Sequence, residues 1–136
     1  MKLEHANIAA VDTAGLTRFL TSAFPDFRLR GEGVDQAGRP WCHIGNDIFY
    51  LAISTVAKPS GRQPYSNIGG LNHLGWEGDD VAALEARMLE NGFEPNLRET
   101  GHPARSRIYF YDPDGNDWEF VQYFSTDPAV RNDYSL

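Results

Sequence analysis

The sequence predicts an α+β protein made of one βαβββ unit used twice, and an internal repeat is the main observation behind this prediction. Segments 3–12 and 71–80 place Leu, His and Asp at the same relative positions, offset by 68 residues (5 to 73 for the histidines). A second pair, Gly-Asn-Asp at 45–47 and at 115–117, is offset by 70 residues (45 to 115). Self-similarity at a fixed offset indicates a supersecondary unit used more than once. Both halves should therefore share one order of strands and helices.

The first half, residues 1–54, shows the pattern of a strand, a helix and three strands. Residues 3–11 alternate as a strand does, and Asp12 can cap the next helix by accepting backbone N–H bonds. That helix ends at Pro25 and carries an apolar stripe of Leu16, Phe19, Leu20, Ala23 and Phe24. Further strands are expected at 27–30, 41–44 and 47–54, with turns at 31–33 and 45–46.

The second half, residues 71–124, follows a Pro- and Gly-rich linker at 55–70 and repeats the order. A strand at 71–77 precedes a helix capped by Asp79 or Asp80, and Asn91-Gly92 ends that helix. Its expected apolar stripe consists of Val81, Leu84, Met88 and Leu89. Strands are expected at 93–98, 106–111 and 117–123, with a turn at 112–115 and a tail at 125–136. Both units together are expected to form a single domain, residues 1–136.

Composition narrows the classes of partner. The chain has 136 residues, 41% of them hydrophobic, and a formal net charge of −7. Nucleic acid and anionic membranes need a basic surface, so neither is expected as the main partner, and a small-molecule substrate is. No apolar run of membrane-spanning length and no signal region is seen, which predicts a cytoplasmic protein. The single cysteine, Cys42, is expected to be buried and inert.

Three residues carry the chemistry of a metal site. His5 and His73 occupy equivalent positions in the repeat, and Glu119 lies just beyond the second Gly-Asn-Asp triplet. Two imidazoles and one carboxylate are a common donor set for a divalent metal, and they leave coordination positions open for substrate. The set favours Fe2+ or Mn2+, and it also permits Zn2+, Ni2+ or Co2+.

The motifs around these residues resemble those of the vicinal oxygen chelate superfamily, which includes glyoxalase I, extradiol dioxygenases, fosfomycin-resistance transferases and bleomycin-resistance proteins. The resemblance spans residues 3 to about 123 and is carried by Leu3-Glu4-His5, Leu71-Asn72-His73 and the stretch from Asp112-Pro113-Asp114-Gly115 to Glu119. It implies two βαβββ units whose sheets form a cup around a metal held by His5, His73 and Glu119, within one chain or across a swapped dimer. A fourth ligand, common in glyoxalases, would fall at Phe49, which cannot bind a metal.

A more local pattern is similar to the signature of extradiol ring-cleavage dioxygenases. It runs from Thr100-Gly101-His102 through Ile108-Tyr109 to Glu119, and it implies that His102 and Tyr109 act beside the metal. Strand alternation independently places Arg107, Tyr109 and Tyr111 on one face. Arg107 is therefore expected to stabilise a carboxylate or an enolate. The leading expectation is a metal-dependent, extradiol-dioxygenase-like enzyme for a small oxygen-chelating substrate.

Alternatives to ring cleavage stay open. Extradiol enzymes usually carry a further histidine before the strand of the second ligand, whereas segment 55–70 offers Lys58 and Tyr65. A glyoxalase-like lyase or isomerase is one alternative, and a non-catalytic drug- or metabolite-binding protein is another. A fosfomycin transferase ranks lower, because residues 99–106 show no counterpart of its cation-binding loop or of its basic phosphonate-binding residues. Exposed sheet edges and the long linker also predict a homodimer.

Overall fold

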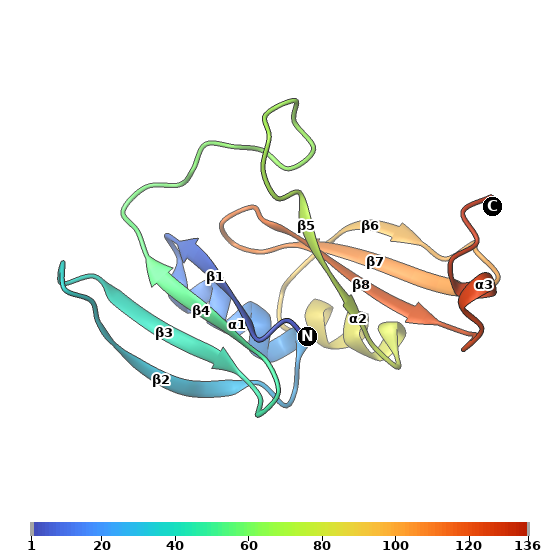
Figure 1. Cartoon of the computed structure of the whole chain (residues 1–136), viewed down its shortest axis with the longest axis horizontal. Coiled ribbons are helices and arrows are strands. Elements are labelled where there is room, and N and C mark those ends of the chain that lie inside the picture. The colour runs from blue at the N-terminus through green and yellow to red at the C-terminus, as the bar shows by residue number, and fades with distance from the viewer. Residues whose placement is uncertain (1, 136) are drawn as a thin grey trace. The chain divides into compact units, whose positions relative to one another are not determined.

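The structure is a computed structural model that describes residues 2–135 (Figure 1). It divides the chain into two compact units, Met1–Arg62 and Gln63–Leu136. The division falls inside the segment predicted as a linker. No helix within residues 2–135 is both long and apolar enough to cross a membrane.

Unit 1 contains one helix and a four-stranded sheet. In chain order its elements are β1 (His5–Ala10), α1 (Thr13–Ala23), β2 (Arg28–Val34), β3 (Pro40–Gly45) and β4 (Tyr50–Thr55). The strands lie side by side in the order β1-β4-β3-β2. β1 and β4 are parallel, with His5 opposite Tyr50, and the other pairs are antiparallel. The predicted βαβββ order is confirmed.

Unit 2 repeats this arrangement and adds a short helix near its end. Its elements are β5 (His73–Glu77), α2 (Val81–Glu90), β6 (Pro95–Glu99), β7 (Arg105–Tyr111), β8 (Asp117–Tyr123) and α3 (Pro128–Arg131). The sheet order β5-β8-β7-β6 matches that of unit 1 strand for strand. β5 and β8 are parallel, with His73 opposite Asp117. The first strand and the last strand of the unit are therefore neighbours in space.

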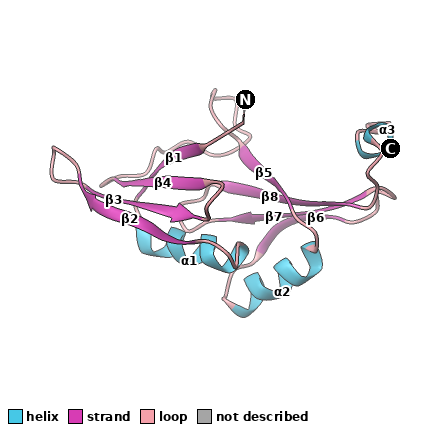
Figure 2. Ribbon diagram, turned by 60° about the horizontal axis from the view of Figure 1, so that its bottom comes forward, coloured by secondary structure: helices cyan, strands magenta, loops and turns pink. Residues whose placement is uncertain are grey.

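Both long helices begin at the predicted caps and cover one face of their own sheet (Figure 2). The Asp12 carboxylate accepts the N–H of Gly15 at 2.8 Å, and the Asp80 carboxylate accepts the N–H of Ala83 at 2.8 Å. Leu16, Phe19 and Leu20 of α1 are fully buried. The helix-free face of each sheet is thus left to carry half-exposed, chemically active side chains.

The prediction that Leu89 belongs to the buried stripe of α2 is wrong. Val81, Leu84 and Met88 are buried, but Leu89 is 46% exposed. One residue beyond Met88 the side chain has turned about 100° around the helix axis, which takes it off the row that meets the sheet.

The predicted turn at 31–33 is also wrong, because β2 runs straight through it. The chain reverses later, where the Asp35 carboxylate accepts the N–H groups of Ala37 and Arg39 and Gly38 adopts a φ of 75°. Gly33 has a packing reason to lie within the strand, since a Cβ there would be 3.0 Å from the Trp41 ring. The glycine makes room for an indole across the strand pair.

The strand predicted at 47–54 begins only at Tyr50. The Asn46 side chain accepts the N–H groups of Ile48 and Phe49, both at 2.9 Å, and holds these residues in a loop. An asparagine side chain that bonds its own backbone in this way competes with strand pairing.

The turn before β8 is organised by Asp112, as the Asp-Pro-Asp-Gly sequence predicts. Its carboxylate is buried and accepts the N–H groups of Asp114 and Asn116, the Asn116 amide and the Trp118 indole N–H, all at 2.9 to 3.0 Å. Burial raises the pKa of Asp112, while the bonds from Asn116 and Trp118 work in the opposite direction. This turn sets where β8, the strand of Glu119, begins.

Candidate functional site

His73 and Glu119 lie side by side on the helix-free face of unit 2. Glu119 is opposite Gly75 in the β5–β8 pair, two residues along the strand from His73. The Nε2 atom of His73 is 3.0 Å from Oε2 of Glu119, and the side chains are 34% and 14% exposed. A Cβ at Gly75 would lie 3.4 Å from the same carboxylate oxygen. The glycine leaves the pair open on the side of β5.

The spacing of these two donors fits a shared metal ion. Two ligands about 2.1 Å from a metal and at right angles to each other are about 3.0 Å apart. One imidazole nitrogen and one carboxylate oxygen are also donors that Mn2+, Fe2+ and Zn2+ accept. Unit 2 therefore offers two adjacent side chains of the donor types that a divalent metal takes. Within either unit of the described chain, no three His, Cys, Asp or Glu side chains gather closely enough to hold a metal by themselves.

Tyr109 stands next to this pair. It is opposite Glu119 in the β7–β8 ladder, is only 7% exposed, and meets the His73 ring edge to face at 5.9 Å. Burial raises the pKa of Tyr109, and a hydrogen bond to Glu119 together with the charge of Glu119 raises it further. The phenol is thus kept protonated and acts as a donor. Its neighbours Ile108 and Phe110 are buried on the helix side, which confirms the predicted alternation.

Arg107 lies on the same face and is shared between two carboxylates. It forms an ion pair with Glu99, and its Nη1 atom is 3.8 Å from Oε1 of Glu119. Its side chain remains 32% exposed. The structure thus brings Arg107, Tyr109, His73 and Glu119 into one group.

His102 is not brought into that group. It precedes β7, and the start of β7 at Arg105 is four residues from Tyr109, about 13 Å along a strand. Its Nδ1 atom accepts the N–H of Ala104 at 3.0 Å, and its Nε2 atom is 3.3 Å from the carbonyl of Asp133 in the C-terminal segment. The contacts of His102 link the β6–β7 loop to the tail, and its catalytic role stays a prediction.

His5 lies in unit 1, on the helix-free face of that sheet. Its Nδ1 atom bonds to the Glu4 carboxylate, and its ring stacks on Tyr50 with a centroid distance of 4.9 Å. Tyr50 in turn lies 4.7 Å from the His43 ring, and His43 lies 4.8 Å from the Trp41 ring. These four rings, from His5, Tyr50, His43 and Trp41, form an aromatic row. The Arg30 guanidinium covers the Tyr50 ring at 4.6 Å.

Strand register corrects the residue equivalent to Glu119 in unit 1. Glu119 is opposite Gly75, and the matching pair in unit 1 is Ala52 opposite Asn7. The equivalent is therefore Ala52 and not Phe49, which lies in the loop before β4. The prediction that this position offers no ligand is unchanged, since a methyl group cannot bind a metal. By the same register, His43 occupies the place of Tyr109.

Sequence analysis missed Asp117, and it named Tyr65 only as one of two polar residues that segment 55–70 offers in place of a further histidine. The Tyr65 hydroxyl is 2.9 Å from Nδ1 of His73 and donates to Oδ2 of Asp117 at 2.6 Å. Strand alternation from Glu119 could have identified Asp117, which is two residues away on the same face. The contact of Tyr65 with His73 could not be predicted from spacing, because Tyr65 lies in a segment without helix or strand.

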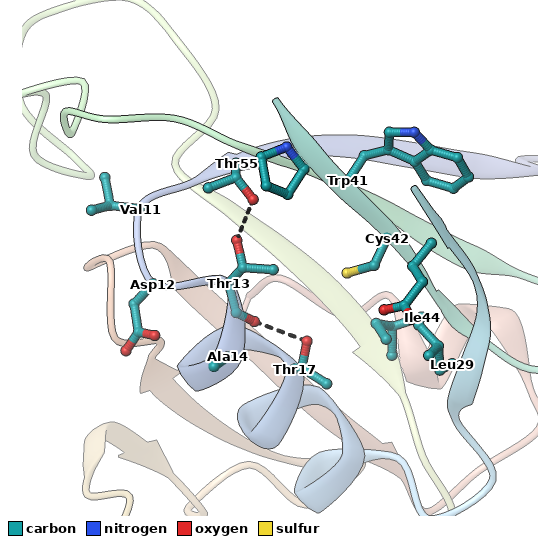
Figure 3. A pocket seen from close by; sticks show the side chains of 12 residues that line it. Val11, Asp12, Thr13, Ala14, Thr17, Leu29, Trp41, Cys42, Ile44 and Thr55 are labelled. Atoms are coloured by element: carbon teal, nitrogen blue, oxygen red, sulfur yellow. Dashed lines mark hydrogen bonds between the residues drawn. The ribbon is translucent and has the colours of Figure 1, made fainter. Parts of the chain in front are cut away.

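Unit 1 also contains a cavity of about 650 Å³ between α1 and the strands β2, β3 and β4 (Figure 3). Its lining is mostly apolar, and the Thr13 and Thr55 hydroxyls bond to each other at 2.9 Å at one side. Cys42 faces it and is 8% exposed, and burial raises the pKa of its thiol. The expectation of a buried cysteine is confirmed. No residue predicted for metal binding or catalysis lines this cavity.

Comparison with known proteins gives one family match. The model of the Glyoxalase/Bleomycin resistance protein/Dioxygenase superfamily matches residues 2–120. No curated protein sequence matches the chain.

Solved structures share the fold at low sequence identity. A glyoxylase/bleomycin resistance protein/dioxygenase domain from Frankia sp. EAN1pec is 15% identical, with a TM-score of 0.76 over 93% of this chain and 95% of that one. The fosfomycin resistance protein FosX from Mesorhizobium loti is 20% identical, with a TM-score of 0.69 over 92% of each chain. A FosX variant from Listeria monocytogenes, solved with Mn(II) and 1S,2S-dihydroxypropylphosphonic acid, is 17% identical, with a TM-score of 0.71 over 96% of this chain and 97% of that one.

Proposed function

The chain belongs to the Glyoxalase/Bleomycin resistance protein/Dioxygenase superfamily, and from this membership we propose that it is a divalent-metal enzyme for a small oxygen-chelating substrate. The observation that carries the proposal is the 3.0 Å contact between His73 and Glu119, with the Tyr109 phenol beside it. His5 is the proposed third ligand, because it holds in unit 1 the place that His73 holds in unit 2.

The proposed metal is Mn2+ or Fe2+, with Zn2+, Ni2+ and Co2+ as further candidates. The Listeria FosX structure contains Mn(II), which supports a hard divalent ion in this fold. When bound, the metal supplies a Lewis acid that polarises chelated oxygens of a substrate. Two imidazoles and one carboxylate leave room for a bidentate substrate and one further small molecule.

The protein's own side chains bind and polarise the substrate. The Tyr109 phenol stays protonated and donates to Glu119 in this structure, and it turns that proton to a substrate oxygen as negative charge develops there. Arg107 offers a cation for a carboxylate or an enolate, and Glu99 holds it in place. His102 stays a proposed catalytic group without a contact that supports it.

Ring cleavage of an aromatic diol is the leading proposed reaction. Taken by itself, the aromatic row of unit 1 offers half-exposed planar rings on which an aromatic group can stack. The same surface equally suits a protein that only sequesters a planar drug or metabolite, so non-catalytic binding is the second candidate. A glyoxalase-like lyase or isomerase is a third. The proposed location is the cytoplasm, where the free thiol of Cys42 stays reduced.

A metal analysis followed by parallel activity and binding assays separates these candidate functions. Protein purified without added metal is assayed for metal content, and then for oxygen uptake with a panel of catechols. Parallel assays follow loss of the methylglyoxal–glutathione adduct, loss of fosfomycin, and binding of planar drugs by fluorescence. About one equivalent of metal with oxygen uptake supports the proposed function. Tight drug binding without stoichiometric metal supports the sequestering alternative and overturns the enzyme.

A further inference from the structure

We propose that Tyr65 is a positioning residue: together with Asp117 it holds the proton of His73 on Nδ1, so that the Nε2 lone pair faces Glu119. The inference rests on the proposed function, because it concerns how the metal site of unit 2 is prepared. It assigns a role to the irregular segment before β5, which has no helix or strand.

The direction of the two hydrogen bonds follows from counting protons. The Tyr65 hydroxyl has a single proton, and the Asp117 carboxylate, 2.6 Å away, can only accept. That proton is therefore committed to Asp117. The second contact of the same oxygen, 2.9 Å from Nδ1 of His73, then needs its proton from the imidazole. Tyr65 accepts, and Nδ1 carries the hydrogen.

The consequence appears at the other nitrogen. With its proton held on Nδ1, the neutral imidazole presents a bare lone pair at Nε2. That lone pair is 3.0 Å from a carboxylate oxygen of Glu119. Two electron-rich atoms at this distance repel each other unless a cation lies between or beside them. The hydrogen-bond relay from Nδ1 of His73 through Tyr65 to Asp117 thus leaves the neutral ring with no proton for Glu119, and it prepares the pair for a metal ion.

The backbone of Tyr65 is held in an unfavourable conformation. Its φ is 59°, in the left-handed region that residues with large side chains rarely adopt. The N–H of Tyr65 donates to the Asn72 side chain at 2.9 Å, which fixes the segment against the residue before His73. Strained backbone of this kind persists where surrounding contacts require it, and it gathers at functional sites.

The first ligand histidine has a different partner for the same purpose. In unit 1 the position of Asp117 is taken by Tyr50, which stacks on His5 and leaves no carboxylate there. The Nδ1 atom of His5 bonds instead to Glu4, its neighbour in sequence. Both histidines thus direct Nδ1 toward a carboxylate, directly in unit 1 and through Tyr65 in unit 2. Partners of this kind orient metal-binding histidines and set which nitrogen is free.

The test compares Tyr65→Phe with Tyr134→Phe, the second at an exposed tyrosine that contacts Arg105. Both remove one hydroxyl from a tyrosine of unit 2, but only the first touches the bond to His73. Mn2+ and Zn2+ affinities are measured by calorimetry, and nitrogen-15 spectra of the imidazoles are recorded for the metal-free protein. We expect Tyr65→Phe to weaken metal binding about 10- to 100-fold, the usual effect of removing such a partner, and to lose the exchange-protected Nδ1 proton of His73. Tyr134→Phe should change neither.

Two results would overturn the proposal. The first is a Tyr65→Phe protein with the affinity and the protected Nδ1 proton of the unaltered chain. The second is a metal-free protein in which His73 carries its proton on Nε2 alone. If the unaltered protein binds no divalent metal, the proposed function fails, but the spectra still decide the relay. Asp117→Asn is the second variant, and with its folding checked by circular dichroism it should weaken metal binding in the same direction.

Discussion

The Nε2 atom of His73 lies 3.0 Å from Oε2 of Glu119, although the two residues belong to the first and last strands of unit 2. The contact exists because β5 and β8 are parallel neighbours, which places Glu119 two residues along the ladder from His73. These are the two predicted metal ligands that belong to the same unit.

Removing the carboxylate should release the metal. Glu119→Ala is expected to weaken Mn2+ binding at least about tenfold, because it deletes a first-sphere ligand. The matched control is Glu77→Ala, which removes an exposed carboxylate paired with Arg131 and should bind metal normally. Calorimetric titration of both variants checks the prediction. Equal affinities would show that Glu119 is not a ligand.

Substitution of His5 in unit 1 tests whether this residue is the third metal ligand. His5→Ala should weaken metal binding as strongly as His73→Ala, because both imidazoles are proposed first-sphere ligands. His43→Ala is the control, since it removes an imidazole from the same face of unit 1 that is not proposed to touch the metal. Metal binding that survives His5→Ala unchanged would mean that another residue completes the site.

Tyr109→Phe should separate catalysis from folding. The substitution keeps the buried ring and removes only the hydroxyl that bonds Glu119. We expect turnover of the identified substrate to fall about 100-fold, the typical effect of one hydrogen-bond donor at a developing charge. Melting temperature should be nearly unchanged, and turnover is measured at saturating metal, because loss of the bond to Glu119 also lowers metal affinity. Undiminished turnover would leave Tyr109 with a packing role only.

Stability of unit 2 should depend on the turn before β8. Asp112→Ala leaves the buried indole N–H of Trp118 and two backbone N–H groups without their acceptor. We expect a loss of about 3 kcal/mol in the free energy of unfolding, since each buried unsatisfied donor costs about 1 to 3 kcal/mol. Urea denaturation followed by fluorescence measures it. Asp79→Ala, at an exposed position, should change stability by less than about 0.5 kcal/mol.

The homodimer is a prediction about assembly. The edge strands are β1 and β2 in unit 1 and β5 and β6 in unit 2, and sheet edges pair readily with a second copy. Light scattering of the full chain at tens of micromolar should give twice the mass of one chain. A monomer at that concentration would contradict the prediction.

Much of the fold could be read from local pattern. The helix caps Asp12 and Asp80, the order of strands, and the split of Ile108 and Phe110 from Tyr109 depend on residues only a few positions apart. Errors occurred where two local signals compete. The Gly-rich stretch at 31–33 reads as a turn but serves as a strand, because Gly33 gives space to Trp41 from the neighbouring strand.

The site was predicted in part. Repeat register singled out His5 and His73, because equivalent positions in a repeat can be recognised without the three-dimensional structure. Glu119 joined them through its donor chemistry and the family resemblance. The contacts that these side chains make could be found only from the three-dimensional structure. Ala52 replaced Phe49 as the equivalent of Glu119 only once the strand pairs were known, since the loop before β4 shifts the offset.

The sequence by itself determined two βαβββ units and which residue types could bind a metal, because periodicity and capping act over a few residues along the chain. Only the tertiary structure decided that His73 and Glu119 touch, that Tyr109 faces them, and that Tyr65 links His73 to Asp117. These contacts join segments that are distant in sequence. Strand pairing and a strained backbone at Tyr65 create them, and neither leaves a periodic signal in the chain.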